Sequence, residues 1–219
     1  MTPAFDAVLC DMDGLLVETE SIWFAAEHEV MASLGGTWSS EHQEKFVGGP
    51  LDRMVTYMLE LTGAPVDADE VLDRVLSTMV RMLLAGPVHW MPGAQQLVGR
   101  LNELAVPVAL VSASLRPMVD AVLGHIGTEH FAVTVSGDDV TAWKPAPAPY
   151  LRAAELVGVD PTRCVAFEDS PTGVASAHAA GCSVIAVPSL RPIQPRDRVR
   201  VVTSLLDVSA DDLSVATRS

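Results

Sequence analysis

The sequence is poor in basic residues and has no long apolar run. Its 219 residues include 14 Lys and Arg against 28 Asp and Glu, which gives a formal net charge of −14. Affinity for nucleic acid depends on basic contacts to phosphates, so this balance argues against a nucleic-acid partner. No run of eighteen apolar residues occurs, and the N-terminus lacks a charged segment followed by an apolar one. We therefore expect no membrane partner and a cytoplasmic protein.

Cysteine is also scarce, and its positions exclude two kinds of chemistry. Cys10, Cys164 and Cys182 lie far apart and form no C-x-x-C pair for zinc or redox work. A phosphatase with a cysteine nucleophile would need an arginine six residues after the cysteine, and none of the three has one. Neither lysine follows a glycine, which excludes a P-loop. The six histidines form no spaced pair suited to a metal, and we assign them no role.

Strand and helix signals alternate over most of the chain. Apolar, β-prone runs predict strands at 5–10, 107–111, 131–135, 163–167, 183–187 and 199–203. Helical spacing predicts helices at 93–104, 116–126, 147–157 and 171–180. This alternation is typical of βαβ units, so we expect an α/β fold with a parallel sheet.

A different pattern separates the first strand from the others. No strand signal interrupts residues 20 to 86, and apolar spacing predicts helices at about 20–34, 41–46, 51–62 and 67–84. We interpret this stretch as an all-helical insert over 19–90, and residues 1–18 and 91–219 as the α/β core. Residues 14–18 predict a small hairpin or flap before the insert, and Trp90-Met91-Pro92-Gly93 predicts the return hinge.

Polar side chains follow four of the predicted strands. Because ligands bind at the carboxyl ends of parallel strands, we expect these side chains to share one site. Carboxylates from two strands, a hydroxyl from a third and one ammonium can bind Mg²⁺ and a phosphate. In chain order they are Asp11 and Asp13, Ser112 and Ser114, Lys144, and Glu168, Asp169 and Ser170.

Most of these signals also have a purely structural explanation. The two aspartates could form a strand-end turn with Gly14. Either serine could cap the helix predicted at 116–126. Glu168 and Asp169 could cap the helix predicted at 171–180. Lys144 is harder to explain in this way, because the chain has twelve arginines and only two lysines. A lysine before a rigid Pro-Ala-Pro run suggests a point charge held in a fixed place.

Taken together, these motifs resemble those of a known superfamily. Asp-Met-Asp-Gly at 11–14, Ser112, Lys144-Pro145 and Glu168-Asp169-Ser170 resemble the four motifs of the haloacid dehalogenase (HAD) superfamily. The helical insert directly after the first motif is similar to that of the C1-capped subgroup, which includes phosphoglycolate phosphatase-like and β-phosphoglucomutase-like enzymes. The likeness runs from Phe5 to about Thr203.

The resemblance implies a role for each motif. Asp11 would be the nucleophile, and Asp13 the general acid and base, of a Mg²⁺-dependent phosphatase. The implied phosphate-binding residues are Ser112, Ala113 and Lys144. The implied metal ligands are Asp11, the backbone carbonyl of Asp13, Asp169 and, directly or through water, Glu168.

The resemblance also implies that the insert is a cap that closes over the site and selects the substrate. Its candidate contacts are Trp23, Glu27, Gly48, Gly49 and Arg53. Trp23 could instead be an aromatic residue that packs between helices. Sugar-phosphate mutases of this type carry a histidine near the position of Trp23 and an arginine near Leu51, and this chain has neither.

We therefore expect a Rossmann-like parallel-sheet core with an inserted all-helical cap domain. The expected function is Mg²⁺-dependent hydrolysis of a small phosphorylated metabolite through an aspartyl-phosphate, by a monomer or weak dimer. The alternatives are a β-phosphoglucomutase-like phosphoryl transferase and a non-catalytic protein that binds a phosphorylated metabolite. A pure binder gains nothing from a nucleophile and a general acid, and dehalogenases of the superfamily lack the second aspartate that this chain has at Asp13.

Overall fold

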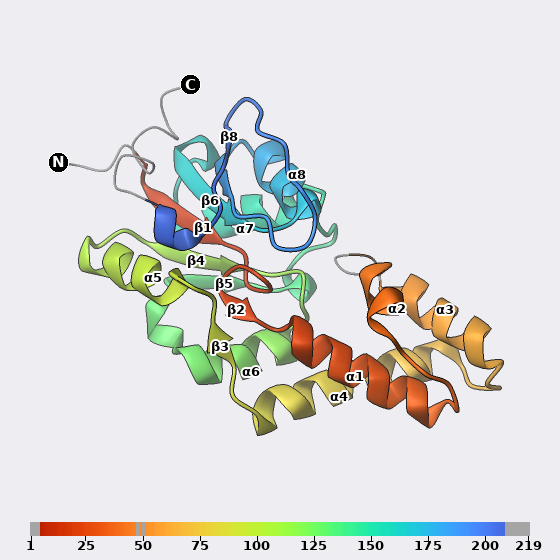
Figure 1. The fold of residues 1–219 in the computed structure, drawn as a ribbon. Coiled ribbons are helices and arrows are strands. Elements are labelled where there is room, and N and C mark those ends of the chain that lie inside the picture. Colours follow the sequence, from red (N-terminus) through yellow and green to blue (C-terminus); the bar gives the residue numbers. More distant parts are fainter. Residues whose placement is uncertain (1–4, 47–48, 50, 209–219) are drawn as a thin grey trace. The chain divides into compact units, whose positions relative to one another are not determined.

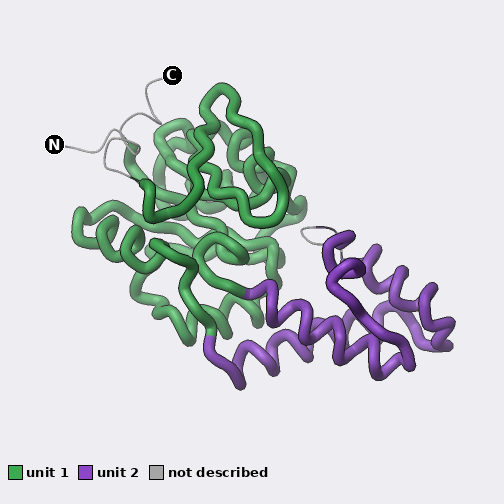
Figure 2. The backbone as a smooth tube through the Cα atoms, in the orientation of Figure 1, with its two compact units in different colours: residues 1–18, 88–219 green, residues 19–87 purple. Residues whose placement is uncertain are grey.

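The computed structural model describes residues 5–46, 49 and 51–208 (Figure 1). The chain divides into two compact units, residues 1–18 with 88–219 and residues 19–87 (Figure 2). Each unit has a hydrophobic cluster of its own. Among the described residues, no helix combines the length and the apolar character that a membrane span needs.

The first unit is built on a six-stranded parallel sheet. In spatial order its strands are β5 (Val133–Val135), β4 (Val108–Val111), β1 (Ala7–Cys10), β6 (Cys164–Glu168), β7 (Ser183–Ala186) and β8 (Val199–Val201). Every residue of β1, β4, β6 and β7 is buried, as expected for parallel strands that are covered on both faces. The parallel sheet confirms the fold class predicted from the alternating pattern.

Four α-helices connect the strands of this sheet. They are α5 (Ala94–Glu103), α6 (Arg116–Ile126), α7 (Ala148–Val157) and α8 (Pro171–Ala179). Short 3₁₀ helices lie at Thr128–His130, Gly137–Asp139, Pro161–Arg163 and Leu205–Asp207. Helix α7 packs against β1, β4 and β5, and α8 packs against β6 and β7. The sheet continues from β1 to β4 on one side and to β6 on the other, and ligands of open parallel sheets bind at the carboxyl ends of the strands where such a change of direction occurs.

A two-stranded ribbon lies beside the junction with the second unit. Strand β2 (Val17–Glu18) pairs antiparallel with β3 (His89–Trp90), and Val17 lies opposite Trp90. The sequence predicted a hairpin or flap at 14–18, but the strand that pairs with β2 is β3, which overlaps the predicted return hinge at Trp90. The structure therefore divides the chain between residues 87 and 88, slightly before the boundary at residue 90. Two-residue strands are too short to give a periodic signal.

The described part of the second unit is entirely helical. Its helices are α1 (Glu20–Ser33), α2 (Ser40–Glu44), α3 (Leu51–Thr62) and α4 (Ala68–Ala85). Both α1 and α3 pack against α4, around a cluster that includes Val30, Met54 and Val75. Asp67 caps α4, because its carboxylate accepts a hydrogen bond from the Asp69 amide at 2.9 Å. Helix α2 ends at Glu44, before the predicted end at residue 46.

Candidate active site

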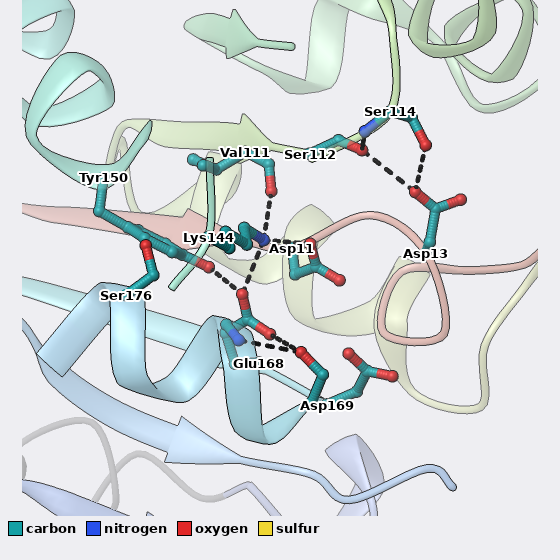
Figure 3. A network of polar contacts seen from close by, with 12 residues as sticks. Asp11, Asp13, Val111, Ser112, Ser114, Lys144, Tyr150, Glu168, Asp169 and Ser176 are labelled. Carbon is teal, nitrogen blue, oxygen red and sulfur yellow. Dashed lines mark hydrogen bonds and ion pairs between the residues drawn. The ribbon is translucent and has the colours of Figure 1, made fainter. Parts of the chain in front are cut away.

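The polar residues that follow the strands come together at one edge of the sheet (Figure 3). Asp11 and Asp13 follow β1, and Ser112 follows β4. Lys144 lies between β5 and α7, while Glu168 ends β6 and Asp169 comes next. All of them belong to the first unit.

Lys144 is the centre of this cluster. Its Nζ donates to Oδ1 of Asp11 at 2.5 Å, to Oε1 of Glu168 at 2.7 Å and to the carbonyl oxygen of Val111 at 3.0 Å. These bonds use all three donors of an ammonium group. Burial disfavours the charged amine, but Asp11 and Glu168 outweigh this effect and raise the pKa of Lys144. Lys144 is therefore a fixed positive charge next to the Asp11 carboxylate.

Three carboxylates crowd around this single cation. Asp11, Glu168 and Asp169 are buried, and each offers an oxygen within 4.8 Å of the others. Burial raises the pKa of Asp11 well above its usual value; Lys144 opposes this shift, and the neighbouring carboxylates add to it. Burial and the charge of Glu168 also raise the pKa of Asp169 to about 6, against a hydrogen bond from Ser189. The ionised cluster therefore holds more negative charge than Lys144 can balance.

This donor set fits a magnesium ion. The cluster offers only carboxylate oxygens, which are the ligands that hard divalent cations prefer. No cysteine or histidine belongs to it, which distinguishes it from the usual ligand set of zinc. A divalent cation would also balance the charge that Lys144 leaves uncompensated.

The Asp13 carboxylate is held apart from this cluster by two serines. Its Oδ2 accepts from Ser112 Oγ at 3.1 Å and from Ser114 Oγ at 2.9 Å. Neither serine hydroxyl caps α6, which has no side-chain cap of its own at that end. Instead, the Arg116 amide in the first turn of α6 donates to the Asp138 carboxylate at 3.0 Å. Helix capping therefore does not account for the two serines.

Helix capping does not account for the acidic pair either. Ser170 caps α8, because its Oγ accepts from the Gly173 amide at 3.0 Å. The Glu168 carboxylate lies against this first turn, where a Cβ on Gly173 would come within 1.9 Å of Oε1. Gly14 makes a similar close approach with φ +79°, and its Cβ would lie 2.5 Å from Asp169 Oδ2. Glycine at both positions leaves room for the carboxylates.

The comparison with known proteins agrees with this geometry. The family model described as "Haloacid dehalogenase-like hydrolase" matches residues 8–187. The chain belongs to this family. It is 34% identical over 193 residues to the protein CbbY of Rhodobacter capsulatus, covering 84% of this chain and 85% of the relative. It is 33% identical over 216 residues to hexitol phosphatase B of Escherichia coli K12, covering 94% of this chain and 96% of the relative.

A solved structure of a relative has the same fold. The crystal structure of CbbY from Rhodobacter sphaeroides in complex with phosphate superposes with a TM-score of 0.82 and 26% identity. The match covers 93% of this hydrolase and 96% of the other chain. Together with the family match, this likeness confirms the superfamily inferred from the motifs.

Two residues that bond to the carboxylates of the site in this hydrolase were not identified from its sequence. Tyr150 Oη donates to Glu168 Oε1 at 2.5 Å, and Ser189 Oγ donates to Asp169 Oδ2 at 2.6 Å. Tyr150 lies in α7, where an aromatic residue is expected to pack in the core and gives no polar signal. Ser189 comes shortly after β7, so the strand-end rule that found the other residues could have found it too.

Two of the expected contacts in the first unit involve main-chain groups, of Ala113 and of Asp13. Ala113 lies between β4 and α6, where its carbonyl would be 2.6 Å from a Cβ on Gly137. This close packing fixes the loop that would present the Ala113 amide. Phosphate binding by Ala113, and metal binding by the Asp13 carbonyl, stay predictions.

The candidate substrate contacts of the second unit have different environments. Trp23 is half-buried and packs against the hydrophobic cluster of its unit. Glu27 is buried in α1, and its Oε2 accepts from Trp38 Nε1 at 2.8 Å. Gly49 and Arg53 are exposed, and Gly48 lies outside the described residues. Substrate contact by these residues stays a prediction.

Proposed function

We propose that this hydrolase is a Mg²⁺-dependent phosphatase of a small phosphorylated metabolite. The observation that carries the proposal is the pairing of the buried Asp11 carboxylate with Lys144, beside two more carboxylates and a separately held Asp13. Its relatives support the choice of substrate class. They include hexitol phosphatase B and, at 31% identity, fructose-1-phosphate phosphatase YqaB of Escherichia coli.

The first half of the proposed reaction transfers the phosphoryl group to the enzyme. An oxygen of Asp11 attacks phosphorus in line, and the ester bond to the leaving oxygen breaks. Asp13 gives its proton to that oxygen, so the product leaves as an alcohol. Lys144 holds Oδ1 of Asp11 at 2.5 Å, and this contact fixes the direction in which the other oxygen points.

The second half regenerates the carboxylate. Asp13, now ionised, takes a proton from a water molecule, and the water oxygen attacks phosphorus. The bond between phosphorus and the Asp11 oxygen breaks, and inorganic phosphate is released. The hydroxyls of Ser112 and Ser114 suit this role of Asp13, because both donate to its Oδ2 and so orient the carboxylate before the phosphoryl group binds.

Binding of the phosphoryl group is assigned to the residues around Asp11. Lys144, the Ser112 hydroxyl and the Ala113 amide would hold its oxygens. For Ser112 this requires an exchange of its bond to Asp13, while the bond from Ser114 to that carboxylate stays in place. Asp11, Asp169 and the Asp13 carbonyl would hold Mg²⁺, which when bound supplies the positive charge that lets an anionic carboxylate approach an anionic phosphate.

Substrate choice is assigned to the second unit, with Trp23, Glu27, Gly48, Gly49 and Arg53 as candidates. Hydrolysis is preferred to phosphoryl transfer between sugar hydroxyls, because a mutase must hold a second phosphate of its substrate. Leu51 stands where the family's mutases offer an arginine for that task. Arg53 is the nearest cation along α3.

The proposal is tested by a panel of phosphorylated sugars, sugar alcohols and small acids with Mg²⁺, measuring released phosphate. We expect turnover of at least one class, and a fall of several orders of magnitude in Asp11→Asn, because the covalent route depends on that carboxylate. Circular dichroism checks that the variant is folded. If folded Asp11→Asn kept a tenth of the parental rate, Asp11 would not be the nucleophile.

A further inference from the structure

The Glu168 carboxylate is shared between the active-site lysine and a buried tyrosine. Its Oε1 accepts from Lys144 Nζ at 2.7 Å and from Tyr150 Oη at 2.5 Å (Figure 3). Tyr150 and Glu168 are both fully buried. The tyrosine ring also lies beneath the ammonium, with 5.2 Å between Lys144 Nζ and the ring centroid. Tyr150 therefore contacts both members of the Lys144–Glu168 ion pair.

We propose that Tyr150 is a positioning residue for the nucleophile and acts through Glu168 and Lys144. This inference rests on the proposed function, in which Asp11 is the nucleophile. Lys144 divides its hydrogen bonds between the Asp11 and Glu168 carboxylates and the Val111 carbonyl. The tyrosine hydroxyl satisfies part of the Glu168 negative charge. Glu168 then attracts the Lys144 ammonium less strongly, and Lys144 keeps its hydrogen bond to Asp11.

The arrangement is rigid enough to transmit such an effect. Tyr150 belongs to the same hydrophobic cluster as Ala153, Val174 and Ala177, so the packed side chain leaves its hydroxyl one position. The segment from Lys144 to Tyr150 is held in addition by Ser176, whose Oγ donates to the Ala146 carbonyl at 2.6 Å. Loss of the hydroxyl would therefore be felt at the Lys144–Glu168–Asp11 contacts, because the backbone on either side is fixed.

Tyr150→Phe isolates the hydroxyl. It keeps the ring, its volume and its contact with the ammonium, and removes one hydrogen bond to a buried carboxylate. We expect kcat to fall about tenfold while KM changes less than about twofold, because the change alters the direction of the reacting carboxylate and leaves Lys144 its charge for binding the phosphoryl group. Val184→Ala is the control, since it makes a cavity in the same cluster without touching the network. We expect its kcat to equal that of the parent.

A second measurement is independent of turnover. Lys45 and Lys144 are the only lysines of the chain, so protein labelled with ¹⁵N-lysine gives just two side-chain signals. The Lys144 ammonium is almost fully buried and its protons should exchange slowly with water. In Tyr150→Phe we expect this exchange to be roughly fivefold faster, because the ammonium is drawn toward Glu168 and its hydrogen bond to Asp11 weakens. The exposed Lys45 is the internal reference, and Val184→Ala should leave the Lys144 signal unchanged.

A double-mutant cycle with Glu168→Gln tests whether the effect passes through Glu168. If it does, Tyr150→Phe should change kcat less than about twofold in the Glu168→Gln background. The inference is overturned if Tyr150→Phe keeps the parental kcat and the parental exchange rate of Lys144. It is also overturned if Tyr150→Phe lowers kcat by the same factor in the Glu168→Gln background as in the parent. If the parent hydrolyses no phosphate ester, the proposed function fails, and the Lys144 signal still decides whether Tyr150 positions the lysine.

Discussion

Replacing Glu27 with glutamine should stabilise the helical unit at alkaline pH. Glu27 is only 5% exposed, and its Oε2 accepts from the Trp38 indole at 2.8 Å. Burial raises its pKa from 4.5 to about 7; the bond from Trp38 opposes this rise, and the charge of Glu20 adds to it. A glutamine oxygen can accept the same bond from Trp38 without a charge to bury.

The sign and size of the effect follow from linkage between protonation and folding. Between pH 4.5 and about 7, the folded state keeps a proton on Glu27 that the unfolded chain has lost. The free energy of unfolding therefore falls as the pH rises through this window, by up to about 3 kcal/mol above pH 7. The glutamine variant escapes this loss. Its advantage should be close to zero at pH 4.5 and approach about 3 kcal/mol at pH 8.5.

Urea unfolding at pH 4.5, 6.5 and 8.5, followed by tryptophan fluorescence, measures this difference. Trp23 and Trp38 report on the helical unit. Glu29→Gln is the matched control, because it lies on the same helix but is 53% exposed and pairs with Arg81 at the surface. It should change the stability by less than about 1 kcal/mol. An equal effect of Glu27→Gln at all three pH values would show that no buried charge is relieved.

Three further predictions concern the active site. Activity should disappear with excess chelator and return on adding Mg²⁺, because the ligands that the cluster offers are all carboxylate oxygens. Full activity in excess chelator would show that the reaction needs no metal. Lys144→Arg should lower kcat by about 100-fold despite its charge, since a planar guanidinium cannot replace an ammonium between Asp11, Glu168 and Val111. Near-normal kcat would mean that only the charge matters. With β-glucose 1-phosphate and a trace of the 1,6-bisphosphate, ³¹P NMR should show free phosphate appearing faster than glucose 6-phosphate, and the reverse order would favour a mutase.

The fold could be predicted from the sequence because its strands and helices alternate with clear signals. The helix at 116–126 has the predicted bounds, and the continuous apolar runs of β1 and β6 reflect burial on both faces. Element ends were less predictable. Helix α2 is only five residues long, and β3 has two residues, so neither has a full period of pattern to mark its limits.

The site could be predicted only as a set of residues at one sheet edge. Strand order and strand ends determine which residues meet there, and this rule found Asp11, Lys144 and Asp169. Which atoms pair with which depends on side-chain directions that a sequence does not give. The bond from Tyr150 to Glu168 and the bond from Trp38 to Glu27 were therefore not foreseen, because aromatic residues in helices and cores carry no sign of a polar partner.

The three carboxylates of the cluster differ in how many of their oxygens already have a partner. Glu168 accepts from Lys144 and Tyr150 at Oε1 and from Ser170 at Oε2. Asp11 accepts from Lys144 at Oδ1, and Asp169 accepts from Ser189 at Oδ2. Within the described residues, each of these two aspartates thus keeps one side-chain oxygen to which no donor is bonded. A cation would bind to uncommitted oxygens at lower cost, since no existing hydrogen bond has to break. We therefore expect Asp11 and Asp169 to contact the metal, while Glu168 acts on Lys144.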